Sequence, residues 1–244
     1  MTKLVISFNR HFFYIAFGAC ATGAALIFAI HQPFIRWCIG LGIAAAIYFI
    51  IASLIASYLN YDHSDLYKLR DWPTKSFPAN LASAVIIHAG FDPASGAFRA
   101  RFPNACVRVL DFFTPAETTE ASIQLAHRLN PPTRPQEHTA LDAWPVDTAS
   151  QDAVMALSAT HEIRDDTRRA SFFREAKRII RPGGRVVVIE QLRDLPNFLC
   201  FGAAAFHFLS HRTWLRSFRD GGLVLEREFS ITPFVRVFVL RRLT

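Results

Sequence analysis

The chain has 244 residues, of which 51% are apolar and only 19% are charged, and it contains 11 Gly and 13 Pro. This composition excludes a disordered, collagen-like or low-complexity chain. The net charge is +7, but three of the basic residues lie in the first sixty positions, and no Lys/Arg run with interleaved aromatic residues is found. We therefore expect no nucleic-acid partner.

Two uncharged apolar stretches, residues 12–30 and 37–59, follow each other near the N-terminus. At 1.5 Å per helical residue they reach roughly 28 and 34 Å, enough to cross a hydrocarbon core of about 30 Å. Inside lipid the backbone has to satisfy its own hydrogen bonds, so each stretch is expected to be a helix. Residues 1–60 are therefore predicted to form a transmembrane helical hairpin that anchors the chain with two passes.

Basic residues set the expected orientation of this hairpin. They flank its outer ends at Lys3, Arg10, Lys68, Arg70 and Lys75. Because the connecting turn has only Arg36, the positive-inside rule places both termini and the following domain in the cytoplasm. The expected location is the inner (cytoplasmic) membrane, with the lipid bilayer as a partner. Three other interpretations stay open: a secretory signal peptide, a lipoprotein cleavage site near Cys20, and two buried helices of a soluble core.

Charged residues, prolines and histidines appear from about residue 61, and residues 61–80 read as a polar, partly helical linker and cap segment. Strand-like and helix-like segments then alternate over residues 81–244. Strands are expected at 82–88, 106–112, 152–158, 185–190, 223–231 and 234–240, with a weak one around 139–141. A short turn or helix is expected at 93–101, and helices are expected at 115–129 (with Thr114 as N-cap), 165–180 and 214–218.

This alternation predicts an α/β fold, a Rossmann-like doubly wound and mostly parallel sheet with helices on both faces. The last two strands are joined only by Thr232-Pro233, so they are expected to form an antiparallel hairpin at one edge.

Residues 197–209 are strongly apolar but too short to span a bilayer. We expect either a buried helix or an interfacial one. In the interfacial case, the phenylalanines of the segment, among them Phe201 and Phe206, would line an entrance through which a lipophilic substrate arrives from the membrane.

Residues 172–190 are the most specific stretch of the chain. Pro182 stops a helix, Gly183 or Gly184 provides a positive φ for the turn, and a β-branched strand follows at once. A generic helix–Gly–strand corner of α/β proteins would share these features.

In its setting, however, this stretch resembles the class I S-adenosylmethionine-dependent methyltransferases, with a domain like that of the type 11 methyltransferases. The family's E-x-x-R-x-L-x-P-G-G segment is matched by Glu175, Arg178, Ile180, Pro182, Gly183 and Gly184. The resemblance covers about residues 80–241, and it includes the segment 144–154 before the fourth strand and the closing segment 214–237.

The resemblance implies S-adenosylmethionine as the cofactor, bound at the carboxyl ends of the strands. Asp111, which ends the second strand, would accept hydrogen bonds from the two ribose hydroxyls; an exposed Asp capping a strand end is the alternative. Asp142 would meet the adenine amino group, although the segment after it is short against the family pattern, and Ser158 would lie near the methionine portion.

The loop after the first strand departs from the family, which has D-x-G-x-G-x-G there. In the stretch 88–96 only Gly90 and, displaced, Gly96 remain, and Pro93 removes a backbone donor. Either Gly90 makes the close approach to the cofactor, with Asp92 or His88 at its amino-acid end, or the pocket has degenerated and the domain binds something else or nothing.

His161 and Glu162 follow the fourth strand, at a rim where the family often carries substrate-facing polar residues. Methyl transfer from a sulfonium mainly needs alignment of the acceptor and, where necessary, removal of a proton. His161 is the candidate base or orienting group, with Glu162 as its partner; a rim histidine bonded to backbone is the alternative. His161, Glu162 and Asp165 could suggest a metal site. However, no His-x₃-His pair is present and no third ligand is evident, so no metal site is expected.

The sequence thus predicts a membrane-anchored S-adenosylmethionine-dependent methyltransferase that acts on an unidentified small-molecule or lipid-like acceptor. The alternative is a non-catalytic, methyltransferase-like binding or assembly module tethered to the membrane. A nicotinamide-dependent enzyme is a third interpretation, which the lack of Gly-x-Gly-x-x-Gly and the antiparallel final hairpin disfavour.

Overall fold

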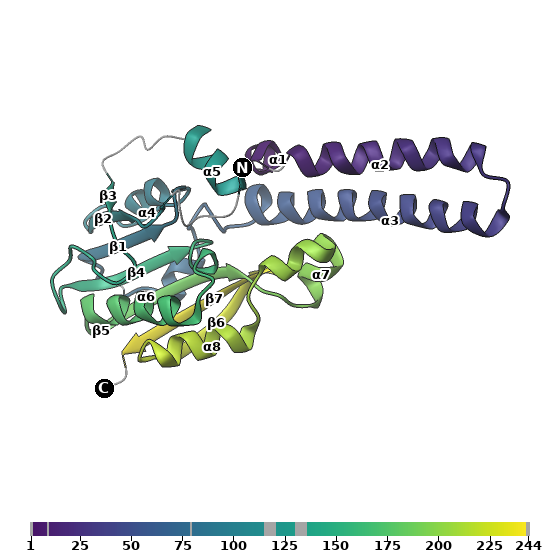
Figure 1. Ribbon diagram of the computed structural model, residues 1–244. Coiled ribbons are helices and arrows are strands. Elements are labelled where there is room, and N and C mark those ends of the chain that lie inside the picture. The colour runs from purple at the N-terminus through teal and green to yellow at the C-terminus, as the bar shows by residue number, and fades with distance from the viewer. Residues whose placement is uncertain (1, 9, 79, 115–120, 130–135, 243–244) are drawn as a thin grey trace.

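The computed structural model describes residues 2–8, 10–78, 80–114, 121–129 and 136–242, and combines a sheet domain with a long helical hairpin that projects from it (Figure 1). The sheet has seven strands in the order β3-β2-β1-β4-β5-β7-β6. The strands are β1 (Ser83–His88), β2 (Cys106–Asp111), β3 (Glu137–His138), β4 (Gln151–Leu157), β5 (Ile180–Gln191), β6 (Leu223–Thr232) and β7 (Val235–Arg242). β1 to β5 pair in parallel, and β6 and β7 form an antiparallel hairpin at the edge, which confirms the predicted fold class.

The projecting hairpin consists of α2 (Arg10–Ala29) and α3 (Pro33–Tyr58), preceded by the short α1 (Thr2–Phe8) and continued by the π-helical η1 (Leu59–His63). Pro33 at the first turn lets α3 begin earlier than the expected residue 37, because a proline there costs no hydrogen bond. Both helices are long and apolar enough to cross a membrane, and none of their most apolar windows is buried inside the molecule. Large side chains are bare along the arm: Phe28 is 86% exposed and Trp37 74% exposed. A helix of a soluble core would bury such side chains.

The two faces of the sheet carry two hydrophobic clusters. On one face, α6 (Asp166–Ile179) and α8 (His211–Asp220) bury Phe172, Phe173, Trp214 and Phe218 against the strands. The other face is covered by α4 (Ser95–Arg101) and by the segment that follows the arm, which includes η2 (Trp72–Lys75). The segment 61–80 is therefore more than a polar linker, because its apolar side chains close one face of the core: Leu66, Leu69, Trp72 and Phe77.

Two details differ from the expected elements. β3 lies at Glu137–His138, ahead of the expected 139–141, because these residues reach the register of Leu110 and Asp111. α5 (Ala121–Leu129) is the described part of the expected helix 115–129; its first residues and most of the loop 130–136 lie outside the described residues.

The Pro-Gly-Gly corner near the start of β5 has a structural explanation. Gly183 has φ +83°, as the turn requires, and a Cβ on Gly184 would meet the carbonyl oxygen of Asp152 at 2.9 Å. One turn earlier, the Arg178 guanidinium donates to the Val146 carbonyl at 2.8 Å and to Glu175 Oε2 at 2.7 Å. The E-x-x-R pair on α6 thus clamps the chain that leads into β4.

Candidate active site

The carboxyl ends of the parallel strands meet at one edge of the sheet, where open α/β sheets bind ligands. His88 and Asp111 end β1 and β2 and lie opposite each other in the register. His88 Nδ1 is 3.6 Å from Asp111 Oδ1, and both side chains are buried. Neither ring nitrogen of His88 has a hydrogen bond of good geometry with a described residue. Burial lowers the pKa of His88, against the opposing charges of Asp111 and Asp92.

Asp111 is turned inward rather than toward bulk water. Its Oδ1 accepts hydrogen bonds from the backbone amides of Gly90 and Phe113, both at 2.8 Å. The carboxylate therefore joins the loop after β1 to the loop after β2, and the interpretation as an exposed cap of a strand end does not hold for it.

The space beside Gly90 is filled by a side chain that sequence reasoning did not single out. Gly90 has φ +80°, and a Cβ there would lie 2.8 Å from the Phe113 ring. Phe113 also stacks on His127, with ring centroids 4.6 Å apart, and His127 Nδ1 lies 3.0 Å from the Gly90 carbonyl oxygen. The glycine approach that the family reserves for the cofactor is thus occupied by Phe113.

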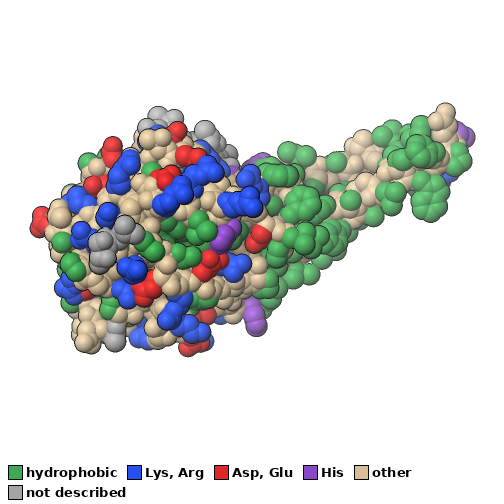
Figure 2. Space-filling view, turned by 90° about the horizontal axis from the view of Figure 1, so that it is seen from below, with side chains coloured by type: hydrophobic (Ala, Val, Ile, Leu, Met, Phe, Trp, Pro, Cys, Tyr) green, Lys and Arg blue, Asp and Glu red, His purple; other side chains and the backbone are tan. Residues whose placement is uncertain are grey.

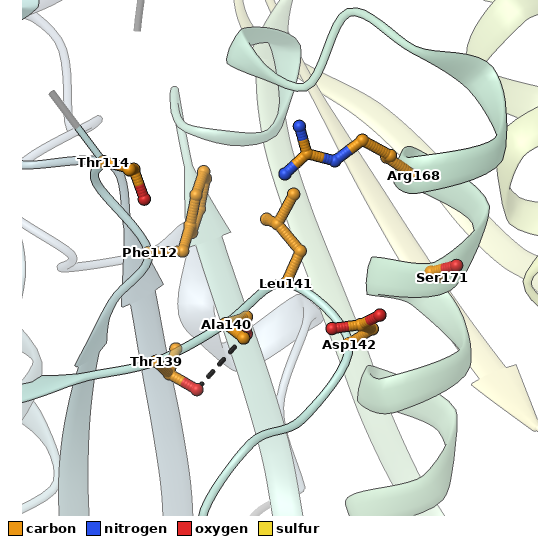
Figure 3. Close-up of a pocket in the computed structure, with 8 residues that line it drawn as sticks. All are labelled: Phe112, Thr114, Thr139, Ala140, Leu141, Asp142, Arg168 and Ser171. Carbon is orange, nitrogen blue, oxygen red and sulfur yellow. Dashed lines mark hydrogen bonds between the residues drawn. The ribbon is translucent and has the colours of Figure 1, made fainter. Parts of the chain in front are cut away.

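A hollow of about 180 Å³ opens next to this point, at the ends of β2 and β3 (Figure 3). Asp142 lies at its rim, beside Ser171, and the guanidinium of Arg168 reaches toward Leu141. Phe112, the residue after Asp111, forms one wall. This is the place at which the resemblance puts the adenine.

The two remaining candidate cofactor residues, Asp92 and Ser158, lie in the segments that follow β1 and β4. Asp92 Oδ1 accepts from the amides of Ala94 and Ser95 at 3.1 and 2.9 Å, so it caps the start of α4. Ser158, with φ +48°, donates its amide to the Ile189 carbonyl at 2.8 Å beyond the end of β4.

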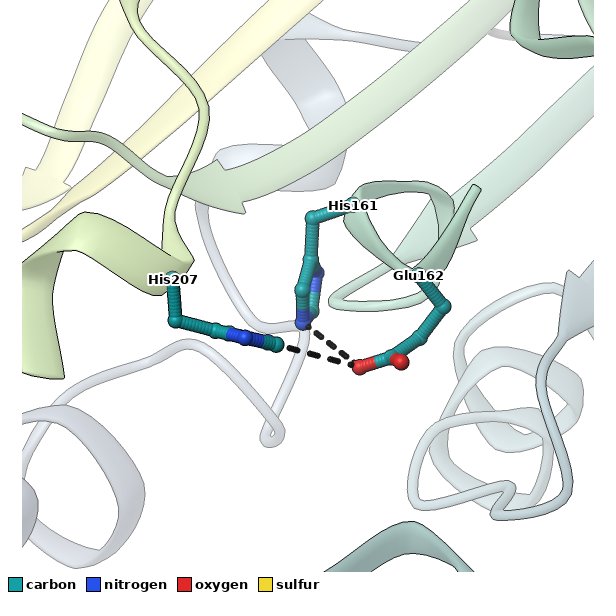
Figure 4. A group of neighbouring side chains, drawn as sticks. All are labelled: His161, Glu162 and His207. Carbon is teal, nitrogen blue, oxygen red and sulfur yellow. Dashed lines mark ion pairs between the residues drawn. The ribbon is translucent and has the colours of Figure 1, made fainter. Parts of the chain in front are cut away.

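His161 and Glu162 lie on η3 (Thr160–Glu162), the turn after β4, and form the centre of a second cluster (Figure 4). His161 Nδ1 is 2.7 Å from Glu190 Oε2, and His161 Nε2 is 3.1 Å from Glu162 Oε1. Glu190, almost fully buried near the end of β5, is fixed through its other oxygen, which accepts from the Thr160 amide and hydroxyl at 2.9 and 2.8 Å. His161 is therefore held by carboxylates on both sides, not by backbone.

The electrostatics of this cluster follow from the packing. Burial alone would lower the pKa of His161, but the charges and hydrogen bonds of Glu190 and Glu162 outweigh it and raise the pKa to about 10. Burial would raise the pKa of Glu162, but hydrogen bonds from His161 and His207 outweigh it and hold that pKa well below its usual range. A histidine that already carries both protons orients a partner rather than removing a proton. The raised pKa suits the orienting role expected for His161 better than the role of a base.

His207 is the member of this cluster that sequence reasoning missed. It ends η4 (Gly202–His207), which continues α7 (Leu195–Phe201), and its Nε2 is 3.6 Å from Glu162 Oε1. Its ring stands edge-on to His161, with centroids 5.2 Å apart. No local pattern links positions 161 and 207; the only signal was one polar residue in an apolar segment.

Comparisons with known proteins find a methyltransferase domain in this chain and solved structures with the same fold. Residues 95–188 match a sequence family described as a methyltransferase domain. A SAM-dependent methyltransferase from Aquifex aeolicus is similar in structure, with 13% identity, a TM-score of 0.51, and coverage of 75% of this chain and 92% of that chain. A SAM-dependent methyltransferase from Methanosarcina mazei is similar with 12% identity, a TM-score of 0.51, and coverage of 72% and 99%.

The mitomycin 7-O-methyltransferase MmcR is similar with 19% identity and a TM-score of 0.47 over 87% of this chain, which spans 59% of that longer protein. No curated protein sequence matches the chain. The strand order and the site at the carboxyl edge define a class I methyltransferase fold. The match to a methyltransferase domain over residues 95–188 and the shared fold support an S-adenosylmethionine-dependent methyltransferase of this class, with S-adenosylmethionine as the cofactor.

The residues at the carboxyl edge of the sheet fit the ribose and adenine of this cofactor, but they restrict the space for its amino-acid end. Polar and flat apolar surfaces for the ribose and the adenine are offered by Asp111, by buried His88 and by the hollow beside Phe112. The hollow alone is smaller than the roughly 300–1,000 Å³ of ordinary ligand sites. Phe113 therefore has to move for the amino-acid end to approach Gly90.

Proposed function

We propose that the protein is a membrane-anchored methyltransferase whose acceptor is a lipophilic molecule that enters from the bilayer. The observation that carries this proposal is an apolar element, α7 with η4, that runs from the arm to the candidate active site (Figure 1). Hydrophobic side chains cover the arm, whereas charged side chains of both signs are spread over the sheet domain (Figure 2).

The contact between this element and the arm lies deep along α3. Gly202 has φ +55°, and a Cβ on it would meet the Phe49 ring at 3.2 Å. Phe49 is about 15 Å along the helix from Leu59, at 1.5 Å per residue. If α3 crosses a bilayer, then the contact at Phe49 lies below the headgroup boundary, and α7 and η4 reach from there toward the interfacial layer.

The surface of this element suits that layer. Four of its large apolar side chains are exposed, with exposed fractions between 44 and 67%: Leu195, Phe198, Leu199 and Phe206. Helices with such a face bury it at the boundary between headgroups and acyl chains. An acceptor with an apolar tail would place the tail along this face and its reactive group at His161 and Glu162, because His207 ends the element beside them.

The anchor itself rests on the exposed apolar surface of α2 and α3. The Thr2 amide donates to Asp62 Oδ2 at 3.0 Å, so the start of the chain lies at the same end of the hairpin as the methyltransferase domain. Together with the basic flanks, this contact supports two passes with both termini and the domain on the cytoplasmic side.

The test uses the full chain in vesicles made from a total membrane lipid extract, supplied with methyl-tritiated S-adenosylmethionine. We expect label in the organic phase. Phe206→Ser and Leu199→Ser should each lower this transfer by about 10-fold or more, since burying such a side chain is worth about 1.5–3 kcal/mol. Leu215→Ser, at an exposed apolar position on α8 away from the arm, is the matched control and should leave transfer unchanged.

Phe201 is less informative, because its half-buried ring packs against the rings of Phe208 and Phe234. Each variant is checked by its thermal midpoint and its binding of S-adenosylhomocysteine. Label that stays in the aqueous phase, or transfer that survives both substitutions on α7 and η4, would argue against a lipophilic acceptor.

A second candidate is the non-catalytic, membrane-tethered module, which is favoured by one observation: Phe113 fills the space beside Gly90. Calorimetric titration of the full chain in detergent with S-adenosylhomocysteine separates the two. Binding that Asp111→Ala abolishes supports the enzyme, and no heat at millimolar ligand supports the module.

A further inference from the structure

We propose that His161, Glu162 and His207 form a binding site for a divalent transition-metal ion, with open coordination positions that face the acceptor. The binding itself stands on the geometry alone. Its role, to hold an oxygen of the acceptor, rests on the proposed function.

The three donor atoms are placed as ligands of one ion (Figure 4). His161 Nε2, Glu162 Oε1 and a His207 ring nitrogen all lie within 4.8 Å of one another. The separations of 3.1 Å (His161 to Glu162) and 3.6 Å (His207 to Glu162) lie close to the edge of roughly 3.3 Å of a tetrahedron with bonds of about 2.0 Å. Two imidazoles and one carboxylate are donors that Zn²⁺ and its neighbours prefer over Mg²⁺ or Ca²⁺.

Glu190 supplies the outer partner that histidine ligands of metals usually have. Its Oε2 lies 2.7 Å from His161 Nδ1, which leaves Nε2 to face the cluster. Its Oε1 is held by the Thr160 amide and hydroxyl, so the orientation of the His161 ring is fixed from behind. Two carboxylates on either side of one imidazole favour a cation at Nε2, and a metal ion replaces the proton there.

The site is reachable and incomplete. The side chains of His161 and Glu162 are 12 and 10% exposed, and that of His207 is 26% exposed. Three protein ligands with access from outside are the arrangement of a reactive metal site rather than of a closed structural one.

One group competes for His207. Arg164 donates to the His207 carbonyl at 2.6 Å, and its Nη2 lies 2.9 Å from His207 Nε2. A bound metal requires the guanidinium to leave the ring nitrogen, which the exposed position of Arg164 permits while the bond to the carbonyl is kept.

The experiment uses the full chain without a histidine tag, in detergent, after removal of metals by a chelator. The chain is titrated with Zn²⁺ against a chromophoric chelator, and bound metal is counted after dialysis. We expect one Zn²⁺ per chain. His207→Ala and Glu162→Gln should each weaken binding by about 100-fold or more, and Glu190→Gln by about 10- to 100-fold, as for other outer partners of metal ligands.

His211→Ala is the matched control, since His211 Nε2 also lies against a carboxylate, 2.9 Å from Glu228, but in a pair with no third metal donor among the described residues. It should bind as the unaltered chain does. If His207→Ala fails to fold by circular dichroism, His207→Gln and the visible bands of Co²⁺ bound to the unaltered chain replace it.

No retained Zn²⁺, unchanged affinity in His207→Ala, or an equal loss in His211→Ala would each overturn the proposal. Because S-adenosylhomocysteine binding and methyl transfer are measured separately, failure of the metal site is distinguishable from failure of the proposed function.

Discussion

Replacing Phe113 by alanine is expected to tighten the binding of S-adenosylhomocysteine to the full chain. The Phe113 ring lies where a Cβ of Gly90 would point, 2.8 Å from that position, and it is only 6% exposed. A cofactor that approaches Gly90 has to displace this ring. The free energy needed to move the ring makes the observed binding weaker than it would be without the ring.

The magnitude follows from the burial of the ring. Exposing a buried phenylalanine costs about 1.5–3 kcal/mol, which lowers the apparent affinity by roughly 10- to 100-fold if the ring has to leave. Phe113→Ala removes this cost and should raise the affinity by about the same factor. It should also lower the free energy of unfolding, by about 3–5 kcal/mol for a large cavity and less where the loop closes.

The assay is calorimetric titration of the detergent-solubilised chain, with Phe113→Leu as a milder variant. Phe102→Ala is the control, because Phe102 packs with Phe77 and Phe98 on the other face of the sheet. The control should lose stability without gaining affinity. If folded Phe113→Ala binds S-adenosylhomocysteine no better than the unaltered chain, the ring does not lie in the path of the cofactor and this reasoning is refuted.

Three further outcomes are expected. Asp111→Ala leaves two buried loop amides without an acceptor and should lower the free energy of unfolding by about 2–4 kcal/mol. Asp111→Asn keeps an oxygen there and should lower it by only about 1 kcal/mol. Thermal unfolding distinguishes the two variants. Burial lowers the pKa of His88, so in mild acid the folded state binds fewer protons than the unfolded state. The contribution of His88 to the free energy of unfolding is therefore fully present above the ordinary pKa of histidine and is lost as pH falls below it. The thermal midpoint of the unaltered chain should therefore drop more steeply below about pH 6.5 than that of His88→Asn, and parallel curves would contradict this. Arg178→Ala should lower the free energy of unfolding by about 2–3 kcal/mol in urea, since it frees the chain before β4 and leaves Glu175 without its cationic partner; a loss below about 0.5 kcal/mol would show that the clamp is dispensable.

The sheet and the apolar arm could be predicted from the sequence because both depend on residue patterns within short segments. A buried parallel strand is a short β-branched or apolar run, and a long uncharged run gives a long apolar helix. A positive φ at Gly183 or Gly184 was likewise expected, since a helix that stops at a proline corner has to turn within a few residues, and the structure has it at Gly183. Segment 61–80 was harder, because Leu66, Leu69, Trp72 and Phe77 stand among charged and polar residues and mostly outside regular elements, yet together they cover one face of the sheet.

The sequence by itself also determined which chemistry-bearing residues stand at strand ends: His88, Asp111, His161 and Glu162. Only the tertiary structure decided what surrounds them. It brought His207 to Glu162 and Glu190 to His161 across many residues of chain, and it placed Phe113 over Gly90. Such contacts depend on how helices and loops pack against the sheet. Packing of this kind produces no periodic pattern in the sequence, so the sequence alone could not predict it.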